Sequence, residues 1–380
     1  MTTALEPTTE QAAIALLRDL VATPSVSGDE HAAVLLLVQR MEAMGLRTHI
    51  DEAGNAVGIV GSDGPDAAEV LLLGHIDTVA GQIPVRVEDG VLWGRGSVDA
   101  KGPLCAFVAA AATADLPANM RVVVVGAVGE ETPTSPGATL VRDRYRPQAC
   151  IIGEPSGWDR FCIGYKGRLL VHATFVQDCG HTAGPVGSVA ERALGWHRRV
   201  VAHIQEWNLG REGVFDTIQP SLQRFNTSSD GLEDAAHLTL GLRLPTWIEP
   251  DELERHLRQI RCDGALRFEG HAPAHRGTRS DALAGAISCA IGSLGGRPTA
   301  TVKTGTSDMN AVARAFSCPI LAYGPGDSTL DHTPNERLDL VEYLRSIGVL
   351  RLALPELALD LSSPSETPAP SAASCPRRPL

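Results

Sequence analysis

The chain has 380 residues, of which 43% are hydrophobic and 21% are charged, so it is long enough for two or three folded domains. Its 33 Lys and Arg against 45 Asp and Glu give a formal net charge of −12, which disfavours general nucleic-acid binding because that requires a basic surface. The first eleven residues carry no signal-peptide pattern, and no apolar run approaches the length of a membrane span. We therefore expect a folded cytoplasmic protein with no nucleic-acid or membrane partner.

The eight cysteines are scattered along the chain without a CxxC pair, and several lie inside apolar runs. This pattern favours reduced, buried thiols over disulfides. It also makes cysteine an improbable metal ligand in this chain.

Four short apolar runs rich in β-branched residues predict the strands of a sheet, at residues 70–73, 122–125, 150–152 and 319–322. Each run is too short for a helix, and none alternates with polar residues, which is typical of strands covered on both faces. Helical patterns lie around them at 10–22, 30–45 and 103–114. The order predicts an α/β fold with a mostly parallel sheet covered by helices, and such sheets bind ligands at the carboxyl ends of their strands.

The pattern changes between residues 161 and 271. Strand-like segments at 168–176 and 237–244 alternate with helices expected from Ser188 and Asp251. Ser188 and Glu191 have the spacing of a capping box, which marks a helix start. We therefore expect an inserted, smaller α+β domain at 161–271, a catalytic domain made of 1–160 and 272–361, and a disordered Ser/Pro/Ala-rich tail at 362–380.

Histidines and carboxylates follow the predicted strands, at the edge where a parallel sheet brings its strand ends together. They are His75 and Asp77, Glu130 and Glu131, Glu154, and, after a Gly/Pro loop, His332. Asp99 precedes the helix expected near Pro103 and could also cap it. Each residue alone has an ordinary surface or core interpretation. Together, and without cysteine, they favour a site for zinc, manganese or cobalt, in which two ions sharing a carboxylate would lie about 3.5–4 Å apart.

The ordered motifs GHIDTV, GRGSVDAKG, GEE, GEP and DHTPNE resemble a known family over about residues 10–355. This is the family of two-zinc amidohydrolases and exopeptidases that includes acetylornithine deacetylase, succinyl-diaminopimelate desuccinylase, aminoacylase and carboxypeptidase G. The resemblance implies a zinc-exopeptidase type of fold with two divalent ions per chain, Zn²⁺ or alternatively Co²⁺ or Mn²⁺. His75 and Glu154 would bind one ion, Glu131 and His332 the other, and Asp99 would bridge them.

The resemblance also implies roles for residues that do not bind metal. Asp77 would orient the imidazole of His75 and raise its basicity. Glu130 would be the general base, accepting a proton from the attacking water and returning it to the leaving amine. The segment GHTAGP, from Gly180, resembles the family's lid motif, in which His181 would stabilise the oxyanion in the partner subunit's active site. That motif implies a homodimer.

Two stretches, GYKGR at 164–168 and KTGTSDMN at 303–310, resemble one branch of the family. That branch releases lysine or ornithine from the C-terminal glutamate of an amino-group carrier protein in amino-acid biosynthesis. Residues 164–168 could equally be a hinge and the start of a strand. Three residues would contact substrate carboxylates: Arg243, Thr306 and Ser307.

Carriers of this family are acidic, as is this chain, so docking would need a local basic patch. Residues 161–279 hold as many basic as acidic residues, and their arginines are the candidates for the patch: Arg198, Arg199, Arg255, Arg258 and Arg261. The alternative function is that of a small-molecule N-acyl amino acid deacylase, similar to acetylornithine deacetylase, or of a dipeptidase. A non-catalytic binding protein on the same scaffold would have lost a ligand or the base, and this sequence has lost neither.

Overall fold

The structure is a computed structural model that describes residues 7–181, 183–184 and 186–361. The chain divides into two compact units. The first unit holds the described residues up to 163, residues 277–301 and the described residues from 312 onward; the second holds the described residues from 164 to 276 and residues 302–311. The expected tail at 362–380 lies outside the described residues.

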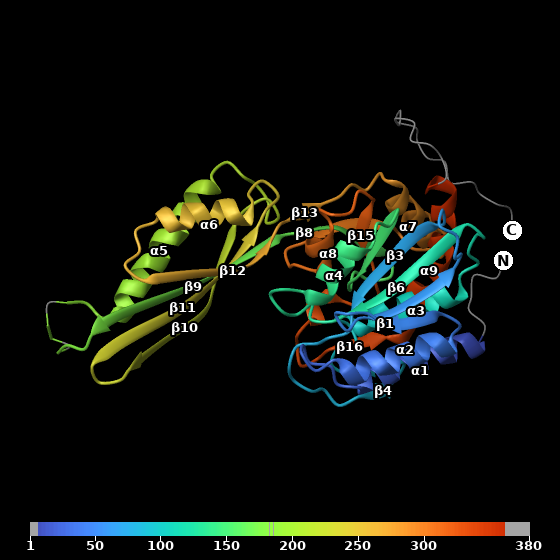
Figure 1. The fold of residues 1–380 in the computed structure, drawn as a ribbon, viewed down its shortest axis with the longest axis horizontal. Coiled ribbons are helices and arrows are strands. Elements are labelled where there is room, and N and C mark those ends of the chain that lie inside the picture. Colours follow the sequence, from blue (N-terminus) through green and yellow to red (C-terminus); the bar gives the residue numbers. More distant parts are fainter. Residues whose placement is uncertain (1–6, 182, 185, 362–380) are drawn as a thin grey trace. The chain divides into compact units, whose positions relative to one another are not determined.

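The largest sheet lies mainly in the first unit and has parallel strands at its centre (Figure 1); its strand β13 and the ends of β8 and β14 belong to residues of the second unit. Its strand order is β1-β2-β6-β3-β7-β15-β8-β13, with β14 also paired to β8. Strands β6, β3, β7 and β15 are parallel neighbours, whereas β2 and β8 join this group in antiparallel fashion. The bounds are β1 Arg47–Ile50, β2 Ala56–Gly61, β3 Ala68–His75, β6 Met120–Ala127, β7 Ala149–Gly153, β8 Arg160–Tyr165, β13 His275–Arg276, β14 Thr299–Lys303 and β15 Ile320–Ala322. The four predicted strands are confirmed as β3, β6, β7 and β15.

Side chains on both faces of this sheet are buried. Val70 and Leu72 of β3 belong to the main apolar core, whereas Leu71 and Leu73, which alternate with them, point to the opposite face and are equally buried. Such double coverage explains why these strands are continuous apolar runs in the sequence. The helices of this unit are α1 Pro7–Ala22, α2 His31–Ala43, α3 Lys101–Thr113, α4 Pro136–Arg144, α7 Ala282–Ser293 and α9 Leu340–Leu361. The predicted helices at 10–22, 30–45 and 103–114 are thereby confirmed.

A small antiparallel sheet, of order β16-β5-β4, holds two loops of the first unit. Its strands are β4 Arg86–Glu88, β5 Val91–Trp93 and β16 Arg337–Asp339. The loop 94–99 leaves β5, and residues 331–336, which follow a short 3₁₀ helix at Ser328–Leu330, lead into β16. Because β5 and β16 pair directly, this sheet connects the loop of Asp99 with the loop of His332.

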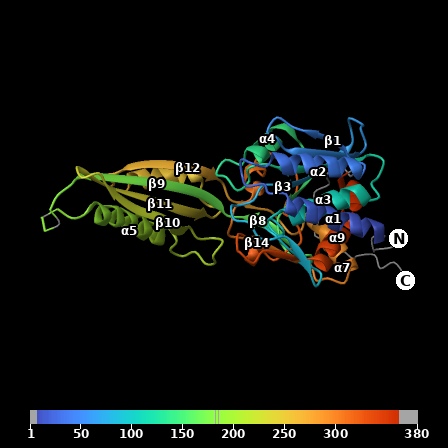
Figure 2. The same cartoon turned by 90° about the horizontal axis from the view of Figure 1, so that it is seen from below.

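The second unit is a four-stranded antiparallel sheet, of order β10-β11-β9-β12, with two helices packed on it (Figure 2). Its elements are β9 Gly167–Asp178, β10 Gln219–Ser229, β11 Glu233–Leu244, β12 Ala265–Ala272, α5 Val189–Trp207 and α6 Pro250–Gln259; α8, Asp308–Val312, lies in both parts of the division. One face of the sheet forms a second core, in which Val171 and Phe175 pack with Trp196 of α5. The expected capping box is present, since Ser188 Oγ accepts the Glu191 N–H at 3.3 Å and the Glu191 carboxylate accepts the Ser188 N–H at 2.9 Å.

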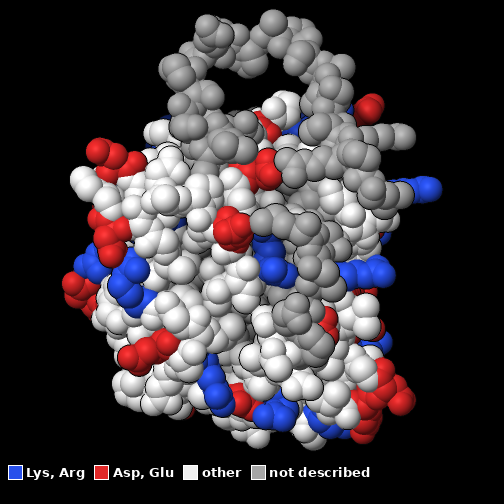
Figure 3. Space-filling model, turned by 90° about the vertical axis from the view of Figure 1, so that its right-hand side faces the viewer, with Lys and Arg blue, Asp and Glu red and all other residues white. Residues whose placement is uncertain are grey.

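Acidic and basic side chains are interspersed on the face of the first unit in Figure 3, outside the part drawn in grey. No helix among the described residues is long and apolar enough to cross a membrane. All cysteines among these residues are free thiols, as the sequence predicts. The expectation of burial is met by Cys105, Cys150 and Cys162, whereas Cys179 and Cys289 are exposed.

Candidate metal centre

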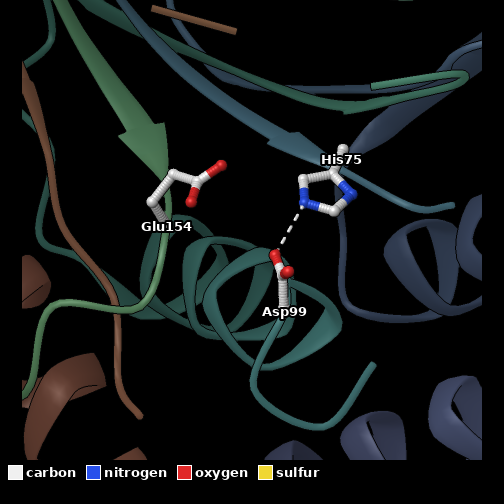
Figure 4. Close-up of side chains that lie close together, drawn as sticks. All are labelled: His75, Asp99 and Glu154. Carbon is white, nitrogen blue, oxygen red and sulfur yellow. Dashed lines mark hydrogen bonds and ion pairs between the residues drawn. The ribbon is translucent and has the colours of Figure 1, made fainter. Parts of the chain in front are cut away.

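Two side chains of the candidate site are held by adjacent strands of the parallel sheet. His75 is the last residue of β3, and Glu154 directly follows β7; the pairing of Gly74 with Gly153 places these strand ends side by side. The two side chains point toward a common space with Asp99 (Figure 4). His75 is 2% exposed and Glu154 is 7% exposed, so this half of the site is built into the body of the unit.

Asp99 lies between two imidazoles. Its Oδ1 is 3.2 Å from Nε2 of His75, and its Oδ2 is 3.0 Å from Nε2 of His332. His332 Nε2 is also 2.8 Å from Oε1 of Glu131. Each carboxylate oxygen of Asp99 therefore faces a different histidine, which is the arrangement that a bridging carboxylate requires.

The donor atoms form two groups that share Asp99: one with His75 and Glu154, and one with Glu131 and His332. Within each group the possible ligand atoms lie within 4.8 Å of one another. Each group offers one imidazole nitrogen and two carboxylates, a set that fits zinc, manganese or cobalt and contains no thiolate. The residues present thus fit a pair of divalent cations.

The electrostatics of the centre favour positive charge. Hydrogen bonds with Asp99 and Glu131 raise the pKa of His332 to about 10. Burial alone would lower the pKa of His75, but its bonds with Asp77 and Asp99 outweigh that effect and raise it well above the usual range. A group of carboxylates that stabilises charged imidazoles also stabilises a metal cation in the same place.

The expectation that Asp99 caps the following helix is wrong. Helix α3 begins at Lys101, its N-cap residue is Ala100, and no side chain accepts a capping hydrogen bond there. The physical reason is competition, because both oxygens of Asp99 are directed at histidines. The helix is held instead by Lys101, whose buried Nζ donates to the carbonyls of Leu20 and Thr23 at 3.0 and 2.7 Å, at the end of α1.

Asp77 supports the centre through two different groups. Its backbone carbonyl is 3.0 Å from Nδ1 of His75, and its carboxylate is 3.5 Å from the same nitrogen. The carboxylate also accepts the backbone N–H groups of Glu130 and Glu131, at 3.0 and 3.1 Å, and the hydroxyl of Ser27 at 2.7 Å. The fully buried Asp77 therefore fixes the turn on which Glu130 and Glu131 lie as well as the orientation of His75.

The remaining candidate residues lie in the second unit. His181 is exposed, and its Nδ1 accepts the N–H of Ala183 at 3.1 Å; two of its neighbours in the motif, Thr182 and Pro185, lie outside the described residues. Arg243 donates to Thr306 Oγ1 at 3.0 Å, so these two side chains are together. Ser307 is buried, and its hydroxyl accepts the N–H of Met309 at 3.2 Å.

Three supporting residues are missing from the sequence analysis. Arg95 donates to Oε2 of Glu336 at 2.8 Å, and the motifs GRGSVDAKG and DHTPNE, which contain these two residues, are the signal that could have indicated the pair. Ser27 lies in a loop 50 residues before its partner Asp77, and no local pattern indicates that contact.

Comparison with known proteins identifies the family. The model of peptidase family M20/M25/M40 matches residues 71–356. The chain belongs to this family. It is therefore a hydrolase that acts on an amide bond, as the motifs predict.

Relatives of known name are similar over nearly the whole chain. A protein of Deinococcus radiodurans named LysW-lysine hydrolase is 48% identical over 360 residues, which cover 91% of this chain and 97% of that protein. A protein of Saccharolobus islandicus named LysW-lysine/LysW-ornithine hydrolase is 25% identical, covering 92% and 96%.

Solved structures share the fold of this M20-family chain. A tripeptidase of Staphylococcus aureus superposes with a TM-score of 0.73 at 18% identity, covering 92% of this chain and 99% of that one. A Bacillus subtilis protein described as a dinuclear metal binding peptidase has a TM-score of 0.66 at 13% identity, covering 93% and 99%. The zinc-exopeptidase type of fold expected from the sequence is thereby confirmed.

Proposed function

We propose that this chain is a two-metal amidohydrolase that releases lysine, ornithine or a related diamino acid from the C-terminal glutamate of an amino-group carrier protein. The observation that supports the chemistry is Asp99, with one oxygen toward each histidine. The observation that supports the substrate is the 48% identity to a LysW-lysine hydrolase over 97% of that protein. In this proposal the substrate is the carrier protein with the amino acid attached, and the reaction belongs to amino-acid biosynthesis.

The proposed chemistry needs two cations and one proton-transfer group. Bound divalent ions would lower the pKa of a water molecule and would polarise the carbonyl of the amide. Glu130 accepts the proton of the attacking water and returns it to the leaving amine nitrogen. Asp77 accepts the backbone N–H groups of Glu130 and Glu131, which fixes the turn that carries both the proposed base, Glu130, and the proposed ligand, Glu131.

Metal analysis tests the stoichiometry and the identity of the metal. We expect two ions per chain, Zn²⁺ in the native protein, after purification and reconstitution with Zn²⁺, Co²⁺ or Mn²⁺. Full activity with a single ion at saturation would contradict a shared Asp99 bridge.

Kinetics on two kinds of substrate test the carrier hypothesis. We expect a much higher kcat/KM for lysine or ornithine release from the carrier conjugate than from acetyl-ornithine or acetyl-lysine, because remote protein contacts help to orient the scissile amide. Equal or better turnover of the small substrates would instead favour the deacylase or dipeptidase function.

An arginine-lined hollow in the second unit supports docking of an acidic carrier. The hollow has a volume of about 380 Å³ and is lined by residues 258–262, Gly264 and Leu266. It includes Arg258, whose guanidinium stacks on Phe268 and pairs with Glu254 at 2.7 Å, and Arg261, whose carbonyl accepts a hydrogen bond from Arg199. Carrier binding through these charges should weaken with salt, since exposed charges are screened over roughly 8–10 Å at 0.1–0.15 M ionic strength. Arg198 and Arg255 complete the proposed patch.

Arg243, Thr306 and Ser307 are proposed to contact a substrate carboxylate. The Arg243–Thr306 hydrogen bond supports a preorganised guanidinium, which suits planar carboxylate recognition. Arg243→Lys should therefore raise KM more than it lowers kcat. An unchanged KM would remove Arg243 from the substrate site.

We also propose that the second unit is a lid and dimerisation domain. Strand β10 is an edge strand whose residues from Ser221 to Ser229 are all exposed, including Leu222 and Phe225. A long exposed edge is a template for pairing with another strand, and the same edge of a second copy would satisfy a twofold symmetric dimer. Light scattering tests the dimer directly.

Mixing two inactive variants tests the proposed role of His181 across the dimer. Glu130→Gln subunits lack the base and His181→Ala subunits lack the oxyanion donor. In a heterodimer with crossed contributions, one site receives both intact groups and activity returns. Absence of recovery after verified subunit exchange would contradict the crossed arrangement.

A further inference from the structure

Glu336, the last residue of the DHTPNE segment, is completely buried and is bonded to the loop of Asp99. Its Oε1 accepts the backbone N–H groups of Val98 and Asp99, at 3.0 and 3.1 Å. A buried carboxylate is costly unless its oxygens are satisfied, and these two bonds satisfy one of them. Glu336 therefore fixes the backbone from which the bridging carboxylate of Asp99 projects.

Arg95 connects the same carboxylate to the loop of His332. Its Nη1 donates to Oε2 of Glu336 at 2.8 Å and to the carbonyl of Thr333, next to His332, at 3.2 Å. Its Nε donates to the carbonyl of Gly81 at 3.0 Å. A guanidinium has donors in several fixed directions, so Arg95 holds three chain segments at once.

The two histidines of the centre depend differently on such support. His75 ends a central strand and is held by the sheet, whereas His332 lies in a loop, has a side chain that is 51% exposed, and has a left-handed backbone with φ of 60°. A non-glycine residue holds that conformation only when its surroundings fix it. Next to His332, the carbonyl of Thr333 accepts a hydrogen bond from Arg95, which lies in the loop of Asp99.

We propose that Glu336 and Arg95 are positioning residues that set the spacing between the bridging Asp99 and His332. Both contact backbone atoms of the two loops, those of Val98, Asp99 and Thr333, and so act on the ligands through the chain that carries them. Their loss should weaken the ion held by Asp99, Glu131 and His332 more than the ion held by His75, Asp99 and Glu154. This inference rests on the proposed two-metal centre and is independent of the proposed substrate.

Three variants separate this role from general stability. Glu336→Gln removes the charge that pairs with Arg95 while keeping the shape of the side chain. Arg95→Lys leaves the two backbone bonds from Val98 and Asp99 to Glu336 in place, but it replaces two separated guanidinium nitrogens with one ammonium nitrogen, which cannot reach Gly81 as well as Thr333 and Glu336. Glu69→Gln is the matched control, because Glu69 forms a partly buried pair with Arg121, at 2.9 Å, near the opposite ends of β3 and β6.

Each metal-free protein is titrated with Co²⁺, and binding is monitored by visible absorption and by competition with a chelator. Thermal unfolding of the same metal-free samples measures their stability. We expect wild type and Glu69→Gln to bind two ions alike. Glu336→Gln and Arg95→Lys should bind the first ion normally and the second about 10–100-fold more weakly, the usual effect of losing an outer contact at a metal site.

Wild-type affinity for both ions in Arg95→Lys, or in a folded Glu336→Gln, would overturn the positioning role. If Glu336→Gln does not fold, Arg95→Lys alone decides. Equal weakening in Glu69→Gln would also overturn it, because the effect would then be one of general stability. Fewer than two ions in the wild type would be a different failure, that of the two-metal centre itself.

Discussion

The two halves of the candidate centre are built in different ways. His75 and Glu154 lie at the ends of neighbouring parallel strands, and both are almost fully buried. Glu131 and His332 lie on a turn and a loop, and the imidazole of His332 is half exposed. The sheet places the backbone of the first half, and Asp77 orients the imidazole of His75. The second half, Glu131 and His332, has no strand beneath it and depends on hydrogen bonds of its turn with Asp77 and of its loop with the Glu336–Arg95 pair. The two halves should therefore differ in how they respond to substitution and to loss of metal.

The largest expected effect concerns Glu130 and its neighbour Glu131. Both lie on the turn of the loop-built half, which is the half formed by Glu131 and His332. Glu130→Gln should lower kcat by about 10²–10⁴-fold, the usual contribution of general acid–base catalysis, because the amide keeps the shape and loses the proton acceptor. Both metals should remain bound. Glu131→Gln should instead lose an ion. Steady-state kinetics with metal analysis checks both variants, and equal metal content and rate in the two would contradict the assignment of base and ligand.

Substitution of one ligand in each half tests whether the halves are independent. His332→Ala should leave one ion per chain, bound by His75, Asp99 and Glu154. Glu154→Ala should weaken binding of the ion held by His75 and Asp99, and it should also leave a cavity among the strand ends. The number of ions bound by each variant, measured at increasing free Zn²⁺, distinguishes the effects of the two substitutions. Loss of both ions in His332→Ala would show that the shared Asp99 makes the centre a single cooperative unit.

The contrast between the halves also explains what the sequence predicts well. Continuous apolar runs define the buried strands, and a residue that follows such a run has its place fixed by the sheet, as with His75 and Glu154. The sequence places Asp99 at the site, but the prediction that it caps a helix is wrong. Local helix-start patterns contain no information on the two distant histidines that Asp99 contacts. The contact of Arg95 with Thr333 joins residues 238 positions apart and has no local signal.

Asp77→Asn tests the hydrogen bonds that hold the turn of Glu130 and Glu131, and it also alters the carboxylate beside His75. An amide has a single oxygen to accept the N–H groups of Glu130 and Glu131 and the Ser27 hydroxyl, so one side of the turn must lose its partner. We expect activity to fall by about 10–100-fold, as for other contacts that orient metal ligands. Ser27→Ala, which removes one donor and leaves the carboxylate, should have a smaller effect. Wild-type kcat/KM in Asp77→Asn would contradict the role of this carboxylate.

The smallest expected effect is a difference in the rate of metal loss, and it compares the halves in the unaltered protein. The side chain of His332 is 51% exposed and that of His75 is 2% exposed, so a chelator in solution reaches the loop-built half more directly. Opening of a loop costs less free energy than opening of central strands in a buried sheet, and this too favours early release from the loop-built half. Chelation of the two-ion protein should therefore proceed in two phases, with the fast phase accounting for one ion. Arg95→Lys should accelerate the fast phase and leave the slow phase unchanged, whereas Glu69→Gln should change neither. A single phase that releases both ions in wild type would mean that the sheet and the loops protect the metals equally, and the distinction between the two halves would then be wrong.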